Sequence, residues 1–275
     1  MDLDSIYASH PLRAETILGR LERSGADLAG LTEWDLAVDP ETELTDQNHS
    51  GGVQAVLELA VASNITKAST VVDLGAGIGG SARVLAAAFG CRVVGIERDA
   101  GRCRDAGELN ERVRLASLVS IRHADALTDA VDVSDVDVLL GQEAWVHFPS
   151  PSDFLARWIP ALAKGGRVAM ADAFLVRRPA DRAEEMLITA LEESWGAHLA
   201  PLDTWRTALD RQGCQVVHTR DVTARAAADC SMLLSMSTRW PEGTVTDAER
   251  QGWERAFAAF GRGIVGSFRV VAARR

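Results

Sequence analysis

The segment Val71–Gly80, VVDLGAGIGG, constrains the fold of this chain more than any other. A β-branched run ends at Asp73, a loop with glycines at positions 75, 77, 79 and 80 follows, and the helical pattern SARVLAAAF comes next. Glycine is needed where the backbone turns with positive φ, or where a ligand approaches with no Cβ in the way. The segment therefore predicts a strand, a glycine turn and a helix that bind a nucleotide or nucleoside. The glycines also fit G-x-G-x-x-G, so the loop alone does not separate a dinucleotide from another adenosine-bearing cofactor.

Strands and helices alternate from Thr70 to the end of the chain. This alternation, with near-continuous apolar strands, predicts an α/β fold with a mostly parallel sheet covered by helices on both faces. The predicted strands are 70–75, 91–97, 119–124, 136–141, 166–174, 214–220 and 266–273, and the predicted helices are 80–89, 99–116, 152–163 and 203–212.

Three segments stand outside this alternation. Residues 1–69 form a helical N-terminal region, and residues 176–202 and 224–265 are insertions into a core that spans 70–275. All three are expected to converge near the carboxyl edge of the sheet, where open α/β folds bind ligands. We interpret them as a helical lid over a substrate pocket; the alternative is peripheral helices that only cover the sheet.

The overall composition of the chain disfavours several classes of protein. The net charge of −10 disfavours nucleic acid as a partner, because binding to a phosphate backbone relies on clustered Lys and Arg. No apolar run approaches the ~20 residues of a membrane span, and the N-terminus lacks the basic-then-apolar order of a signal peptide. The four cysteines form no CxxC pair, which favours a reducing cytoplasm without disulfides or zinc. We therefore expect neither a membrane partner nor a bound metal ion. The sequence leaves open whether the chain forms a homo-oligomer.

Acidic residues end the first three predicted strands. Glu97 can accept hydrogen bonds from both hydroxyls of a ribose, as in NAD-binding folds. Asp125 can accept from an adenine amino group, although a helix cap or turn is an equal alternative. Asp73 lies where the ammonium group of an amino acid could sit. With no Lys or Arg in the glycine loop for a pyrophosphate, the set suits a cationic, phosphate-free adenosine ligand such as S-adenosylmethionine (SAM).

The motifs resemble those of the class I SAM-dependent methyltransferases. DLGAGIGG, Glu97, Asp125 and LAKGGRVAMADAF follow in the family's order. Within that superfamily the chain is similar to small-molecule enzymes of the sarcosine/dimethylglycine and tocopherol type and to methyltransferases of antibiotic sugars. This narrower likeness rests on DQNHSGG at 46–52, where Asn48 replaces the usual aromatic residue, on QEAWVH at 142–147 and on ADAF at 171–174.

The resemblance implies a Rossmann-like seven-stranded sheet with SAM as the only cofactor. Gln47 and His49 would approach the sulfonium end of SAM or the acceptor; alternatively, the HSGG segment is simply a helix start with Ser50 as its cap. The cofactor-binding residues that it implies are Gln47, His49, Asp73, Gly75, Gly77, Gly79, Glu97, Arg98, Asp125, Ala126 and Gln142.

Three residues are candidates for catalysis. His147 follows the fourth strand, and its ordinary pKa of about 6.5 suits a general base; it could instead cap or pack against the next helix. The likeness to sugar O-methyltransferases implies that Asp172 is the partner of His147. The alternative is that Asp172 is only a hydrogen-bonded carboxylate at the end of a strand. The likeness to geranyl diphosphate C-methyltransferases implies Glu143 as another base, unless it accepts from loop amides.

These observations predict methyl transfer from SAM to a small-molecule acceptor. A hydroxyl of a secondary metabolite is favoured, and an amine nitrogen comes next. The seven tryptophans suit an apolar or ring-shaped acceptor, with core packing as the alternative. Two other functions stay open: a cyclase or isomerase of natural-product biosynthesis with SAM as a scaffold, and a NAD-dependent oxidoreductase.

Overall fold

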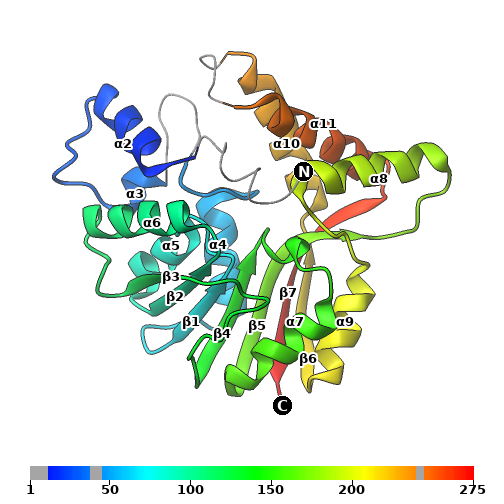
Figure 1. Cartoon of the computed structure of the whole chain (residues 1–275), viewed down its shortest axis with the longest axis horizontal. Helices are drawn as coiled ribbons and strands as arrows, with labels where there is room; N and C mark the ends of the chain where they lie inside the picture. The colour runs from blue at the N-terminus through cyan, green and yellow to red at the C-terminus, as the bar shows by residue number, and fades with distance from the viewer. Residues whose placement is uncertain (1–11, 38–44, 240–244) are drawn as a thin grey trace.

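A seven-stranded sheet forms the centre of the computed structural model, which describes residues 12–37, 45–239 and 245–275 (Figure 1). Its order is β3-β2-β1-β4-β5-β7-β6. The pairs on the β3 side through β5 are parallel, and β7 is antiparallel to both of its neighbours. The predicted α/β, Rossmann-like fold is confirmed. The strands are β1 (Thr70–Leu74), β2 (Arg92–Glu97), β3 (Val119–His123), β4 (Val136–Gln142), β5 (Leu162–Leu175), β6 (Cys214–Asp221) and β7 (Val265–Arg274).

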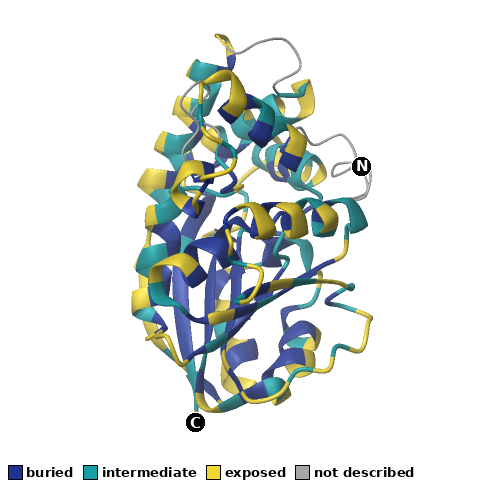
Figure 2. Cartoon of the chain, turned by 90° about the vertical axis from the view of Figure 1, so that its left-hand side faces the viewer, coloured by how far each residue is buried: buried dark blue, intermediate teal, exposed yellow. Residues whose placement is uncertain are grey.

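Helices cover both faces of the sheet because its strands are apolar on both sides. Val71 of β1 packs with the α4–α5 face, whereas Val72 and Leu74 pack with α7 and α9 on the other. The strands are buried between the two helical layers, whose outer surfaces are exposed (Figure 2). The α-helices are α2 (Ala14–Arg23), α3 (Glu33–Leu36), α4 (Gly52–Ala62), α5 (Gly80–Phe89), α6 (Ala100–Arg112), α7 (Pro151–Trp158), α8 (Arg182–Trp195), α9 (Leu202–Arg211), α10 (Thr223–Ser237) and α11 (Asp247–Gly261).

Two predicted helices end earlier than the sequence pattern suggested. The helix predicted for 152–163 ends at Trp158, and a 3-10 turn, η2 (Ile159–Ala161), leads into β5. Pro160 lies in that turn, and proline cannot donate the backbone hydrogen bond that would continue an α-helix. The helix predicted for 99–116 ends at Arg112, shortly before Arg114 takes a positive φ of 60°.

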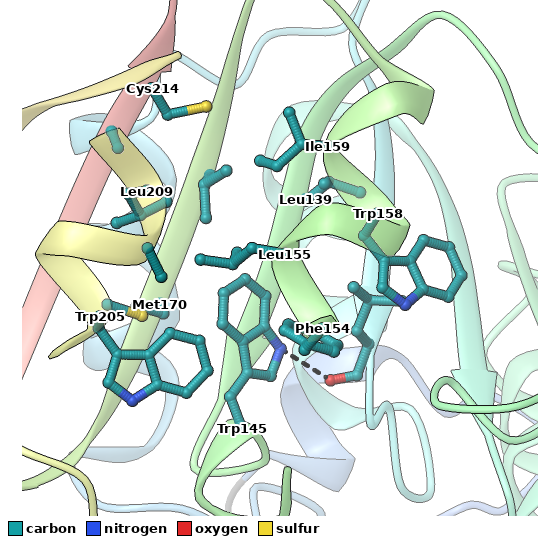
Figure 3. Close-up of a cluster of buried hydrophobic side chains, with 14 of the residues drawn as sticks. Leu139, Trp145, Phe154, Leu155, Trp158, Ile159, Met170, Trp205, Leu209 and Cys214 are labelled. Atoms are coloured by element: carbon teal, nitrogen blue, oxygen red, sulfur yellow. Dashed lines mark hydrogen bonds between the residues drawn. The ribbon is translucent and has the colours of Figure 1, made fainter. Parts of the chain in front are cut away.

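An aromatic cluster fixes the loop after β4. The buried Trp145 ring lies 4.9 Å from that of Phe154 and 5.8 Å from that of Trp205, and its indole Nε1 donates to the Leu74 carbonyl at 3.2 Å (Figure 3). Gly141 allows this packing, because a Cβ there would lie 1.8 Å from the indole nitrogen. The cluster thereby holds the 3-10 turn η1 (Trp145–His147).

Described helices of all three segments outside the alternation lie at the carboxyl edge of the sheet, whereas α4 of the first segment packs on a face of the sheet (Figure 1). Helices α2 and α3 lie at the β3 side of that edge, and α8, α10 and α11 lie over the β5–β7 side. A hydrophobic cluster joins α8, α10 and α11 through residues such as Leu191, Ala226 and Ala256. Within the described ranges, no helix is both long enough and apolar enough to cross a membrane. Residues 1–11, 38–44 and 240–244 of the predicted lid lie outside the described residues.

Candidate active site

A cavity of about 640 Å³ opens at the carboxyl ends of the central strands. Pockets for small molecules commonly have volumes of about 300–1,000 Å³. One wall is the segment 45–52 before α4, and the opposite wall comes from α8, α10 and α11. The predicted site residues that line the cavity are Gln47, His49, Asp73, Gly75, Gly77, Glu97, Arg98, Asp125, Ala126, Gln142, Glu143, His147 and Asp172.

The glycine turn after β1 needs its glycines for different reasons. Gly75 has a φ of 85°, and a Cβ there would lie 2.6 Å from the Ala144 Cβ, so the turn and the loop after β4 approach closely. Gly79 caps α5 with a φ of 83° and does not line the cavity. A Cβ on Gly79 would instead lie 3.0 Å from Nη1 of Arg83, behind the loop. Gly79 thus starts the helix outside the cavity lining, and its contact with the cofactor stays a prediction.

Three carboxylates from neighbouring strand ends line the cavity as expected. Glu97 accepts from the backbone N–H groups of Gly77 (2.9 Å) and Asp99 (2.8 Å). Asp73 is 2% exposed, and burial together with the charge of Glu97 raises its pKa to about 7. Among the described residues, no donor is hydrogen-bonded to the Asp73 carboxylate. Asp125 makes a turn by accepting from the Leu127 N–H at 2.8 Å, as in its alternative role, while still lining the cavity.

A buried arginine that the motifs did not single out anchors the N-terminal wall. Arg83 of α5 has no exposed surface and donates to Glu33 at 2.9 Å and to Asp46 at 2.6 Å. It also donates to Asn110 at 3.1 Å and to the Ile78 carbonyl at 2.7 Å. Burial and the nearby Asp46 raise the pKa of Glu33 well above its ordinary value, because two acids share one guanidinium.

Both ring nitrogens of His49, a residue of the cavity wall, lie within hydrogen-bond distance of neighbouring side chains. Its Nε2 lies 3.2 Å from the Gln47 side-chain oxygen and from the Ser81 hydroxyl, and its Nδ1 lies 2.8 Å from the Gln142 amide nitrogen. Burial lowers its pKa to about 4, so the ring is neutral at pH 7. The predicted Ser50 cap is wrong: α4 begins at Gly52 with Gly51 as its N-cap.

Glu143 occupies a strained position directly after β4. Its φ of 48° is uncommon for a residue with a side chain, and such outliers gather at functional sites. Its carboxylate accepts from the Ser50 N–H at 2.9 Å, which matches the alternative role as an acceptor for loop amides. Burial raises its pKa, so its ionised form is disfavoured until a donor or a cation approaches.

Asp172 holds the turn that carries His147 and does not hydrogen-bond the imidazole. Its Oδ2 accepts from the N–H groups of Trp145 (2.8 Å) and Val146 (3.2 Å), and its Oδ1 accepts from the Ala173 N–H at 3.1 Å. Burial and then the charge of Glu143 raise its pKa to about 8. The expected direct pairing with His147 is thus replaced by contacts to the backbone of η1.

His147 is positioned as a neutral imidazole. Its Nδ1 lies 3.1 Å from the Gly196 carbonyl oxygen, which can only accept, so Nδ1 carries the proton and Nε2 carries the lone pair. Burial lowers the pKa of His147, which keeps the ring neutral near pH 7. The cap of α7 is Ser150, which accepts from the Asp153 N–H at 3.3 Å, so the alternative of a capping role for His147 does not hold.

The cavity wall formed by α8, α10 and α11 includes two of the tryptophans considered from the sequence and two charged residues, Arg225 and Asp229, that the motifs did not indicate. Trp195 and Trp253 line the cavity, whereas Trp145 and Trp205 are core residues, Trp34 is 46% exposed and Trp240 lies outside the described residues. Asp229 of α10 accepts from the Gly51 N–H at 2.8 Å, and Arg225 donates to the Gly51 carbonyl at 3.0 Å. In the described part of the chain, no group of three or more His, Cys, Asp and Glu side chains could hold a metal ion.

This chain is similar to a methyltransferase family model and to several known methyltransferases. Residues 72–170 match the family model of a methyltransferase domain. Tocopherol O-methyltransferase of Arabidopsis thaliana is 30% identical over 137 residues, covering 47% of this chain and 39% of the relative. Sarcosine/dimethylglycine N-methyltransferase of Halorhodospira halochloris is 32% identical over 109 residues, covering 38% of this chain and 37% of the relative. The chain thus spans well under half the length of these curated relatives.

A solved structure shares the fold across nearly the whole chain. Geranyl diphosphate C-methyltransferase from Streptomyces coelicolor A3(2), in complex with Mg²⁺, geranyl-S-thiolodiphosphate and S-adenosyl-L-homocysteine, superposes with a TM-score of 0.68 at 16% identity. The match covers 97% of this chain and 93% of that one. Residues 72–170 thus carry the sequence features of a methyltransferase domain, and the chain shares its fold with a methyltransferase solved in complex with S-adenosyl-L-homocysteine.

Proposed function

We propose that this chain transfers the methyl group of SAM to a hydroxyl oxygen of a small-molecule acceptor, a secondary metabolite. One observation carries the proposal: the same cavity contains carboxylates from the ends of β1 and β2 and a neutral imidazole just after β4. The named relatives include O-, N- and C-methyltransferases, so the choice of oxygen rests on His147.

SAM fits the donors and acceptors of this cavity. Its ribose hydroxyls, adenine amino group and ammonium are all donors, and Glu97, Asp125 and Asp73 respectively offer acceptor oxygens. The Asp73 carboxylate is buried and lacks a hydrogen-bond donor among the described residues, which suits a cation beside it. When bound, SAM supplies an electrophilic methyl group on its sulfonium.

The acceptor hydroxyl requires a base, and His147 supplies one in this proposal. With Nδ1 donating to Gly196, Nε2 can accept the hydroxyl proton at neutral pH. Asp172 is a positioning residue that orients the η1 turn through two backbone amides. Glu143 is the alternative base, and its contact with Ser50 couples it to the N-terminal wall. Helices α8, α10 and α11, together with the segment before α4, serve as the lid that excludes water.

Binding of SAM should release a proton near pH 7. The raised pKa of Asp73, about 7, means that the free carboxyl is half protonated there, and an ammonium beside it favours the ionised form. Affinity should therefore rise between pH 6 and pH 8, by up to about tenfold per unit below pH 7. Calorimetry in two buffers of different ionisation enthalpy measures the proton release. Asp172 also titrates in this range, so Asp73→Asn is the decisive variant: proton release that persists in it would contradict the assignment.

Loss of the Glu97 carboxylate should weaken cofactor binding strongly. Hydrogen bonds to a charged group contribute about 1.5–3 kcal/mol, so Glu97→Ala should raise the Kd for S-adenosylhomocysteine (SAH) about 10- to 150-fold. Titration calorimetry measures the change. Glu108→Ala is the matched control, because that α6 carboxylate is about half exposed, pairs with the exposed Arg112 and does not line the cavity. Equal affinities in the two variants would remove Glu97 from the cofactor site.

The reaction itself is tested after SAM and SAH binding is measured. Hydroxylated and amine metabolites are incubated with the enzyme and SAM, and mass spectrometry follows both products. A gain of one methyl group with release of SAH supports the proposal. Conversion of an acceptor without a mass gain, at full SAM occupancy, would instead support a SAM-scaffolded cyclase or isomerase. Tight NADH binding with no SAM binding would favour an oxidoreductase.

A further inference from the structure

Acidic groups dominate the part of the cavity under α8, α10 and α11. Glu143, Asp172 and Asp229 line it there, and among the described residues Arg225 is the cation on the same wall. Arg225 already donates to the Gly51 carbonyl. The other cavity-lining arginines belong to α2, the turn after β2 and α6, on the opposite side of the sheet edge (Figure 1).

Two of these carboxylates meet at one point of the backbone. Glu143 accepts from the Ser50 N–H at 2.9 Å, and Asp229 accepts from the adjacent Gly51 N–H at 2.8 Å. They come from the end of β4 and from α10, yet they bind consecutive amides. Their mutual repulsion helps to raise the pKa of Glu143, and the charge of Glu143 in turn raises that of Asp172. Arg269 acts on Glu143 but is paired with Glu58, so the ionised forms of these carboxyl groups are disfavoured until a further cation approaches.

A buried amide oxygen next to this pair lacks a partner. Gln142 is 9% exposed, and its Nε2 is engaged with His49, while its Oε1 has no hydrogen bond within the described structure. An unsatisfied buried acceptor costs about 1–3 kcal/mol, so it points to a ligand that donates. Glu143 and Asp229 each have one backbone donor and further lone pairs, and the Gln142 oxygen has no donor within the described structure. In a cavity also lined by Trp195 and Trp253, this excess of acceptors matches a ligand with an N–H-bearing cation and an aromatic or other ring.

We propose that the acceptor carries a protonated amine that binds between Glu143 and Asp229, with the Gln142 oxygen as a further acceptor. An ammonium donates three hydrogen bonds and favours the ionised forms of both carboxyl groups, which a neutral or anionic acceptor would not do. The ring of the acceptor then lies against the tryptophans of α8 and α11, and its hydroxyl is presented to His147. This assignment rests on the proposed function, because it gives this part of the cavity to the acceptor.

Matched ring compounds of different charge test the assignment. Tryptamine, N-acetyltryptamine and indole-3-propionate share an indole and differ in charge, and each is titrated into the SAH-saturated protein by calorimetry. We expect tryptamine to bind at least about tenfold more tightly than the other two, as for a hydrogen-bonded charge pair. Asp229→Asn, which keeps an oxygen for the Gly51 amide, should abolish this preference, and Glu143→Gln should reduce it.

Controls separate this proposal from the proposed function. Asp203→Asn on α9 removes a highly exposed carboxylate and should leave the preference unchanged. Unaltered SAH affinity in Asp229→Asn verifies an intact fold. Equal binding of the neutral or anionic probe, binding of none of the three, or an unchanged preference in Asp229→Asn would overturn the amine site while SAH binding persists. Absence of SAH binding would instead overturn the proposed function, and this assignment with it.

Discussion

Replacement of Arg83 by methionine is expected to lower the free energy of unfolding by about 3–5 kcal/mol, the usual cost of breaking a buried ion pair on one side. Arg83 is completely buried, and both Glu33 and Asp46 are at most 1% exposed in their side chains. Methionine fills much of the same volume but leaves these two acids without a cation. Asn110 and the Ile78 carbonyl would lose their donor as well.

Urea denaturation with matched variants measures this effect. Arg112→Ala removes an exposed i,i+4 pair with Glu108, for which a loss of only about 0.3–0.5 kcal/mol is expected. The triple variant Arg83→Met, Glu33→Gln, Asp46→Asn should recover part of the stability, because no uncompensated charge remains buried. A loss below 1 kcal/mol for Arg83→Met, close to that of the exposed control, would contradict the anchoring role.

The same substitution should also change the cavity wall, because Asp46 connects Arg83 to the residues that line the cavity. Gln47 donates to Oδ1 of Asp46 at 2.6 Å, the carboxylate oxygen that Arg83 does not bind, and Gln47 in turn contacts His49. Gly80 lies directly beneath this segment, since a Cβ there would lie 2.4 Å from the Asp46 carbonyl oxygen. Release of Asp46 would therefore displace a wall of the cavity, and SAH affinity should fall in folded Arg83→Met protein.

Local patterns in the sequence predict the sheet and the strand-end carboxylates that line the cavity. Strand ends are marked by the switch from β-branched residues to glycine or acid, so Asp73, Glu97 and Asp125 could be assigned to one edge before their contacts were known. Arg83 could have been noticed as the one charge in the otherwise small and apolar SARVLAAAF, which indicates a buried partner. Its partners Glu33 and Asp46 lie in a region without strong periodicity.

Contacts between distant segments could not be predicted in this way. Asp229 and Gly51 are 178 residues apart, and nothing in the pattern of α10 indicates that its carboxylate binds the start of α4. Asp172 was assigned by likeness as a partner of His147, but its oxygens accept from the η1 amides. Backbone amides have no residue type, so sequence motifs do not reveal them as partners.

Substitution of His147 by alanine is expected to lower kcat about 10²- to 10⁴-fold, the usual contribution of a general base. Because His147 has no predicted contact with the cofactor, the Kd for SAH should change little. The lowered pKa of His147 implies that wild-type kcat/KM stays high as pH falls to 6.5 and declines only below it; this acidic limb should vanish in the variant. Steady-state kinetics with the acceptor found by methyl-incorporation screening measures both effects.

Three further variants decide which residue acts as the base. His218→Ala changes an exposed histidine of β6 and should leave turnover unaltered. Asp172→Asn should lower kcat less than His147→Ala and keep the acidic limb, because Asp172 acts through the backbone of η1. Near-normal turnover in His147→Ala, together with a large loss in Glu143→Gln, would transfer the role of base to Glu143. Near-normal turnover in both would favour an amine acceptor that binds the enzyme with its lone pair already exposed, since such a nitrogen needs no base.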